Sequence, residues 1–281
     1  MKLATFDDGS RDGQLLVVAR DLTRAHFATG IVTRMQALLD DWNFLAPQLQ
    51  DLADALDAGK ARHALPFDPR SCLAPLPRAF HWARTPTPEG EGPPVLTRHA
   101  GDRWQRPQAV ISQPAGAAPP QAELVLAAIT GELGAELTPE QGLDGIRLLM
   151  FGLCWRLHGE SDAVATGWAP VALTADELGP GWRGGRLDAK LELRWRGRAV
   201  AAADAVRPEA RRAHLGQRIA AAAAASGLGS GSIVGGVPMA SWTPPAEPTE
   251  EAPTPGLLAA ELRLAEGLAG FGAIEHRLLT A

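Results

Sequence analysis

Two apolar runs place the strongest constraint on how this chain can fold. Residues 124–129 are continuously apolar, and residues 146–153 are nearly so. Runs of this length are typical of strands that are buried on both faces of a sheet. Residues 187–195 instead alternate apolar and charged side chains before Arg196-Gly197, which predicts a half-buried strand that ends in a turn. The patterns predict an α+β fold with a β-rich core.

The first 70 residues predict a small domain of their own. Short apolar segments are joined by polar turns, and the Asp8-Gly9 pair favours such a turn because glycine adopts positive φ without steric cost. Over residues 33–59 the apolar residues recur every three or four positions, as in an amphipathic helix. We expect Pro47 to kink or break this helix and Gly59 to end it. The prediction is a β-rich N-terminal domain that carries one helix.

Residues 71–281 predict the main domain, with two irregular segments. Residues 85–118 and 243–255 are rich in proline and have few periodic apolar positions, so we expect little regular structure in either. An alanine-rich helix is predicted over residues 208–225, and strands over 232–234 and 271–278.

Composition excludes several classes of function. The formal net charge is −5, whereas binding to nucleic acid or to an anionic membrane requires clustered Lys and Arg. No stretch approaches the ~18 apolar residues that a membrane-spanning helix requires. The opening residues show no apolar leader and no cleavage signal, so we expect a cytoplasmic protein.

The two cysteines, Cys72 and Cys154, are too few for a disulfide framework or a cysteine-based zinc site. We expect both to be buried apolar residues, because nothing in the sequence supplies Cys154 with a base or an oxyanion hole. A glycine-rich run, GLGSGSIVGG, follows a predicted helix and precedes a strand, which is the reverse of a dinucleotide-binding loop. The chain has eight Trp and no Tyr, for which we have no physical account.

Six blocks of the sequence resemble the fumarylacetoacetate hydrolase family, and in particular its bacterial members with a small N-terminal domain. The blocks occur in the family's order and cover most of the chain. The resemblance implies a mixed β-sandwich or roll behind the N-terminal domain. The blocks are MKLATFDDGSRDGQLLVVARDL, FDPRSCLAPLPRAFHW, APVALTADELGPGWRGGRL, LELRWRGR, GLGSGSIVGG and FGAIEHRL.

The resemblance also implies a chemistry. The family cleaves carbon–carbon bonds in acylpyruvate-type diketo acids, or carries out related isomerase, decarboxylase and hydratase reactions. A divalent metal, usually Mg²⁺, chelates the substrate, a His-centred group activates water, and a Lys helps to hold the substrate. Mg²⁺ requires several carboxylate oxygens that converge on one point.

The carboxylates that the family uses are mostly missing from this chain. The family's Glu-x-Glu pair falls on Gln121-Ala122-Glu123, so one carboxylate has become an amide. The Asp after the next buried strand falls on Cys154, and a thiol is a poor ligand for Mg²⁺. The segment that carries the first metal Asp and the catalytic His should follow Trp82, where the chain is shortened and has neither residue.

The remaining functional positions also differ. His81 and His99 are nearby in the sequence, but neither follows an Asp at the family's spacing. The substrate-binding Lys should fall near residues 162–163, where there is none, and the family's Thr aligns near Pro238.

Glu123 is therefore the one carboxylate of four that remains, and a single carboxylate cannot hold Mg²⁺ against water. We expect no cofactor, and we expect Glu123 to be a vestigial metal position that is solvated or paired with an Arg such as Arg156. The expected function is that of a catalytically inactive, fumarylacetoacetate hydrolase-like protein that serves as a partner or scaffold subunit or as a binder.

One alternative stays open, a divergent metal-dependent hydrolase or isomerase that acts on diketo acids with a rebuilt site. Its replacement residues would be His158, Glu160 and Asp162, in the loop where the family places its substrate contacts. The partners expected are a second copy in a homodimer, an active paralogue in a heterodimer, or a small diketo acid. Neither nucleic acid nor a membrane is expected. The sequence does not identify a physiological ligand.

Overall fold

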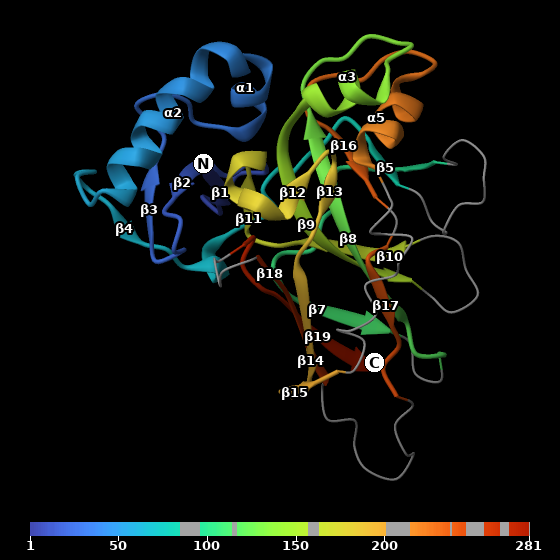
Figure 1. Cartoon of the computed structure of the whole chain (residues 1–281). Helices are drawn as coiled ribbons and strands as arrows, with labels where there is room; N and C mark the ends of the chain where they lie inside the picture. Colours follow the sequence, from blue (N-terminus) through green and yellow to red (C-terminus); the bar gives the residue numbers. More distant parts are fainter. Residues whose placement is uncertain are drawn as a thin grey trace.

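The computed structural model has a β-rich α+β fold with few helices, which confirms the predicted fold class. Its strands form a twelve-stranded sheet, a five-stranded sheet and a two-stranded hairpin (Figure 1). The residues that the structure describes are 1–84, 96–113, 117–156, 163–200, 214–236, 238–245, 256–264 and 270–280.

The N-terminal strands and helices are close to those expected, with one correction. Two helices, α1 (Met35–Asp40) and α2 (Trp42–Asp57), replace the single helix predicted over residues 33–59. The break falls at Asp41, which leaves the helical region with φ −126° and ψ 44°, while α2 continues through Pro47. The strands of this part are β1 (Lys2–Phe6), β2 (Gln14–Val18), β3 (Arg24–Phe27) and β4 (Leu65–Pro66), followed by the short 3₁₀ helix η1 (Pro69–Ser71).

The twelve-stranded sheet runs through both parts of the chain. Its order is β4-β3-β2-β1-β11-β9-β8-β16-β5-β6, with β10 beside β9 and β17 beside β8. The N-terminal strands join the remainder through β1, which pairs antiparallel with β11. The other strands are β5 (Trp82–Arg84), β6 (Thr97–His99), β8 (Gln121–Thr130), β9 (Ile146–Arg156), β10 (Ala163–Trp168), β11 (Val171–Leu173), β16 (Ser232–Gly235) and β17 (Ala240–Trp242).

The five-stranded sheet has the order β15-β14-β18-β19-β7. The half-buried strand expected from the alternating residues is present as β14, and the strand expected near the end of the chain is β19. The bounds are β7 (Gln108–Gln113), β14 (Lys190–Trp195), β15 (Arg198–Ala199), β18 (Gly256–Arg263) and β19 (Ile274–Thr280).

Part of the segment expected to be irregular is in fact regular. Strands β6 and β7 both lie within residues 85–118, so the prediction of little regular structure is wrong for them. β7 pairs parallel with β19, from Gln108 opposite Glu275 to Gln113 opposite Thr280. Residues 243–245 are not in a helix or strand, and residues 246–255 lie outside the described residues.

The remaining elements are short. They are α3 (Pro139–Asp144), α5 (Leu215–Ala223), the 3₁₀ segment η2 (Ala175–Gly181), β12 (Trp182–Arg183) and β13 (Arg186–Leu187). α3 and α5 lie together at one end of the central sheet (Figure 1). Of the helix predicted over residues 208–225, α5 occupies the later part, and residues 208–213 lie outside the described residues. None of the described helices is long and apolar enough to cross a membrane.

The two faces of β8 and β9 contribute to two different hydrophobic cores. One core lies between the two large sheets and contains Leu124 and Phe151 together with residues of β14, β18 and β19. The other contains Val125 and Met150, and the leucines of α1 and α2 cover it. Burial on both faces explains why these two strands are continuously apolar. It also places any polar residue of these strands deep inside the molecule.

Candidate functional site

The position where the family resemblance places its metal site is a buried cluster on one face of the twelve-stranded sheet. Glu123 on β8 lies directly opposite Cys154 on β9, and Cys154 lies opposite Thr166 on β10. β5 brings Arg84 to this region, because β5 pairs with β16 and β16 pairs with β8.

Two arginines bind the same oxygen of Glu123. Arg84 Nη2 donates a hydrogen bond to Glu123 Oε2 at 2.8 Å, and Arg156 Nη2 donates to that oxygen at 3.2 Å. The Arg84 side chain is 1% exposed, that of Glu123 5% and that of Arg156 14%. The cluster is thus an ion triad that is closed to solvent on the Arg84 side and partly open at Arg156.

The charges of the triad depend on one another. Burial lowers the pKa of Arg84, but the electrostatic effect of Cys154 and Glu123 outweighs it, so the pKa lies above its ordinary value. Burial also raises the pKa of the Cys154 thiol, and Thr166 Oγ1 donates a hydrogen bond to its sulfur at 3.6 Å. Because a thiol with a raised pKa is neutral at pH 7, Glu123 is the anion that stabilises the charge of Arg84.

Three tryptophans pack on the same face as the triad. Trp82, Trp104 and Trp168 contact one another edge to face, with ring centroids 5.2–6.4 Å apart. A Cβ atom added at Gly152 would lie 2.6 Å from the Trp168 ring, so glycine is required there for the indole to lie on the sheet. Large rings and the helices above them therefore cover this face.

The opposite face of β9 carries the one histidine that is fully buried among the described residues. Trp155 Nε1 donates to His276 Nδ1 at 2.9 Å, so Nε2 carries the proton and donates to the carbonyl of Arg106 at 3.1 Å. Burial lowers the pKa of His276 to about 4. This imidazole is neutral, and both of its nitrogens are bonded to protein.

The residues at the triad do not fit a divalent metal. Among the described residues, no group of three or more His, Cys, Asp or Glu side chains is placed to hold an ion. A guanidinium lies against the single carboxylate, and a neutral thiol is its cross-strand neighbour. Mg²⁺ and Mn²⁺ require several oxygen ligands, which this cluster does not provide.

The sequence-predicted residues have different outcomes. Glu123 is buried and paired with Arg156, as expected, but its shorter bond to Arg84 was not foreseen. His158, Glu160 and Asp162 lie outside the described residues. One feature of the sequence could have pointed to Arg84. It lies two residues after Trp82, in the segment where the family has its first metal-binding Asp and this chain has none.

The fold agrees with the resemblance to the fumarylacetoacetate hydrolase family, and comparison with known proteins supports that resemblance. Residues 1–78 match the family model described as fumarylacetoacetase N-terminal domain 2. No curated protein matches the sequence. The N-terminal part of the chain belongs to this domain family, and the resemblance to the fumarylacetoacetate hydrolase family is confirmed.

Solved structures extend the likeness to the whole chain. A maleylpyruvate hydrolase from Sphingobium sp. SYK-6, in complex with manganese(II) and pyruvate, has a TM-score of 0.69 at 16% identity, with 100% of both chains covered. A probable 2-hydroxyhepta-2,4-diene-1,7-dioate isomerase from Mycobacterium abscessus gives 0.67 at 14% identity, over 100% of this chain and 99% of that one. A fumarylacetoacetate hydrolase from Exiguobacterium antarcticum gives 0.64 at 16% identity, with both chains fully covered. At these identities the likeness establishes the fold.

Proposed function

We propose that this chain is a non-catalytic protein with the fumarylacetoacetate hydrolase fold, which acts as a partner or scaffold subunit or as a binder. The observation that carries the proposal is the bond from Arg84 to Glu123. A buried guanidinium supplies the positive charge that balances the carboxylate, a part that the family gives to a metal ion. A cytoplasmic location belongs to the same proposal.

A divalent metal at Glu123 would have to displace Arg84. The maleylpyruvate hydrolase that this fold resembles holds manganese(II) and pyruvate in its structure. In this chain, a dication about 5 Å from a guanidinium would be repelled by about 7 kcal/mol at an effective dielectric constant of about 20.

The nearby polar groups are equally unsuited to activate water. Cys154 is a neutral, fully buried thiol. His276 lies on the other face of β9, and both of its ring nitrogens are bonded to Trp155 and Arg106. A general base must reach the water proton that it removes, and neither group can.

An acylpyruvate hydrolysis assay tests this proposal. Purified protein with Mg²⁺ or Mn²⁺ should consume acetylpyruvate no faster than buffer with the same metal. The variants Gln121→Glu and Cys154→Asp, alone or together, should not restore turnover, because the water-activating base is still missing and such groups act as a unit. Metal-dependent turnover by the unmodified protein would contradict the proposal.

One observation favours a second candidate, a divergent enzyme with a rebuilt site. Arg156 binds Glu123 and also pairs with Ala163, so the described residues on either side of positions 157–162 lie opposite each other on β9 and β10. His158, Glu160 and Asp162 fall between them in the sequence. If the unmodified protein turns over acetylpyruvate, replacing these three residues with Ala should abolish the activity.

The partner part of the proposal has its own test. Affinity purification from the native source, followed by mass spectrometry, should recover either a second copy of the chain or an intact paralogue with the full carboxylate set. A chain that is recovered as a monomer, without such a partner and without stabilisation by diketo acids, would contradict it.

A further inference from the structure

A cleft that the proposed function does not use lies between the two large sheets, at the end of the molecule where β14 and β15 meet β17. Its volume is about 820 Å³, which is within the range of small-molecule sites. We call it the Trp195–Trp242 cleft. It is lined by Trp195, Arg196, Arg198, Ala199, Val200, Trp242, Thr243 and Pro245.

Two indole rings from different sheets form the apolar part of this cleft. Trp195 ends β14 of the five-stranded sheet, and Trp242 ends β17 of the twelve-stranded sheet. Their centroids are 5.1 Å apart and their planes are inclined by 53°. Both rings are half-buried against the core between the sheets, so each is held in place while one side remains accessible.

A glycine next to Trp195 makes room for its ring. Gly256 lies directly against the indole, where a Cβ atom would clash with the ring. A glycine at this point of β18 lets the ring pack against the neighbouring strand. The orientation of Trp195 is therefore built into the sheet.

Two guanidinium groups provide the polar part of the cleft. Arg196 and Gly197 both have positive φ, at 50° and 78°, and form the tight turn between β14 and β15. This turn places Arg196 Cζ 5.6 Å from the centre of the Trp195 ring, in cation–π range. Arg198 lies opposite Trp195 in the register, is exposed, and has no ion-pair or hydrogen-bond partner among the described residues. The described lining contains no carboxylate.

We infer that the Trp195–Trp242 cleft binds a planar organic anion, meaning a conjugated ring that carries a carboxylate. Ring stacking on indoles contributes about 0.5–1.5 kcal/mol per contact. Guanidinium forms paired hydrogen bonds with a carboxylate, and it has the planar geometry to do so beside a stacked ring. An aliphatic anion would lose the ring stacking, and a neutral ring would lose the hydrogen bonds to guanidinium.

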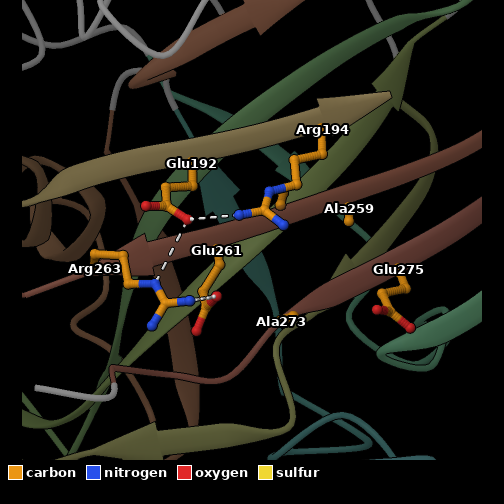
Figure 2. Close-up of a pocket in the computed structure, with 8 residues that line it drawn as sticks. Glu192, Arg194, Ala259, Glu261, Arg263, Ala273 and Glu275 are labelled. Atoms are coloured by element: carbon orange, nitrogen blue, oxygen red, sulfur yellow. Dashed lines mark ion pairs between the residues drawn. The ribbon is translucent and has the colours of Figure 1, made fainter. Parts of the chain in front are cut away.

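The adjacent surface of the same sheet offers a matched control. Arg194 precedes Trp195 on β14, so its side chain points to the opposite face. There Arg194 Nη2 lies 3.7 Å from Glu192 Oε2. Arg263 Nε lies 3.6 Å from the same oxygen, so the three side chains form a row of ion pairs (Figure 2). Like Arg198, Arg194 is an exposed arginine of the hairpin, but the carboxylates around it neutralise its charge.

Calorimetric titration of the full chain with 2-naphthoate tests the inference. Saturable binding is expected, and naphthalene-2-methanol and cyclohexanecarboxylate should each bind at least about tenfold more weakly. Arg198→Gln should weaken naphthoate binding about tenfold, the effect of losing one charge-assisted contact. Arg194→Gln should change it less than about twofold.

A second variant keeps the test independent of surface charge. Trp242→Ala should weaken naphthoate binding by about two- to twelvefold, provided that its circular dichroism spectrum and cooperative melting match the parent. The inference is overturned if the unmodified chain shows no saturable binding up to about 5 mM probe. It is also overturned if Arg194→Gln weakens binding as much as Arg198→Gln does, since the attraction would then be general and not sited in the cleft. Neither result bears on the acylpyruvate assay, because the cleft and the triad share no residue.

Discussion

Arg84 is a buried charged residue whose stability in the fold depends on its ion pair with Glu123. Its side chain is buried, its Nη2 donates to Glu123, and its Nε and Nη1 atoms are buried without a hydrogen-bond partner among the described residues. A buried charge persists only where a partner compensates its lost hydration. Glu123 is thus the residue on which Arg84 depends, and the reverse holds in part, because Arg156 also reaches Glu123.

Removing Arg84 should therefore destabilise the fold. Arg84→Met should lower the free energy of unfolding by about 3 kcal/mol, because Glu123 would remain buried with only the longer Arg156 contact. Urea denaturation followed by fluorescence measures this loss. The double variant Arg84→Met/Glu123→Leu should recover much of it, and a double variant as unstable as the sum of the single changes would contradict the account.

An exposed ion pair provides the control. Arg70 binds Asp68 through several hydrogen bonds, but the side chain of Arg70 is 74% exposed. Arg70→Met should leave the urea midpoint of unfolding nearly unchanged, because an ion pair that is exposed to solvent contributes little to stability.

The sequence predicted only half of this cluster. Glu123 and its pairing with Arg156 could be expected because the sequence predicts buried strands over residues 124–129 and 146–153, and the two residues lie close to the ends of these runs. Arg84 could not, because it reaches Glu123 through the parallel pairing of β5 with β16, and those strands are far apart in the chain. A short segment followed by prolines gives no local signal for such a pairing.

His276 predicts a dependence of stability on pH. Its pKa is about 4 in the folded chain because it is buried, whereas an unfolded histidine titrates near 6.5. Between these values the unfolded chain binds a proton that the folded chain does not, so stability falls as the pH is lowered from about 6.5 to about 4. The contribution lost over this window is about 3 kcal/mol.

Urea denaturation at pH 7, 6 and 5 checks this dependence. The parent should lose more stability over the range than His276→Asn, which has no imidazole to protonate. Equal slopes for the two proteins would show that folding does not lower the pKa of His276, and would contradict its burial as a neutral imidazole.

At the scale of elements, strands with two buried faces were predictable and edge strands were not. The middle parts of β8 and β9 are apolar because each of their two faces packs in a different hydrophobic core. β7 has only Ile111 fully buried, and its partner β19 lies near the far end of the chain. Such a strand is stabilised by pairing that the local sequence does not encode, so residues 85–118 read as irregular. The break at Asp41 was missed for a similar reason, since the apolar period continues through it.

The contact between β9 and β10 depends on a missing side chain. A Cβ atom at Gly152 would lie 2.6 Å from Cζ3 of the fully buried Trp168. Gly152→Ala should therefore lower the free energy of unfolding by about 1–3 kcal/mol through overpacking. Thermal melting by circular dichroism measures the effect.

Gly134→Ala is the matched control for this prediction. A Cβ atom at Gly134 would meet no atom within 4 Å, and the residue does not have positive φ. Its effect should stay within about 0.5 kcal/mol. Equal effects at the two positions would show that the Trp168 ring can move away from the sheet.

At the scale of the whole molecule, the N-terminal part covers the face on which the triad lies. The core beneath α1 and α2 contains Leu38 and Leu56 together with Trp82, Cys154 and Trp168. β1 continues the sheet through β11, so the two parts of the chain share both a sheet and a core (Figure 1). The N-terminal part thus helps to enclose the Arg84 side of the triad.

The Trp195–Trp242 cleft lies beside a different hydrophobic core from the triad. It opens between the two sheets, at the margin of the other core, and is lined by the ends of β14 and β17. The proposed function and the binding proposed for this cleft can be tested separately, because the cleft and the triad share no residue.

Calorimetric titration of Mn²⁺ into the unmodified protein tests the central claim most directly. The account predicts no saturable binding, because Arg84 supplies the charge that balances Glu123, and no group of three or more His, Cys, Asp or Glu side chains in the described part of the chain is placed to hold an ion. Saturable binding with a dissociation constant below about 100 µM, abolished by Glu123→Gln, would contradict it and would identify a working metal site.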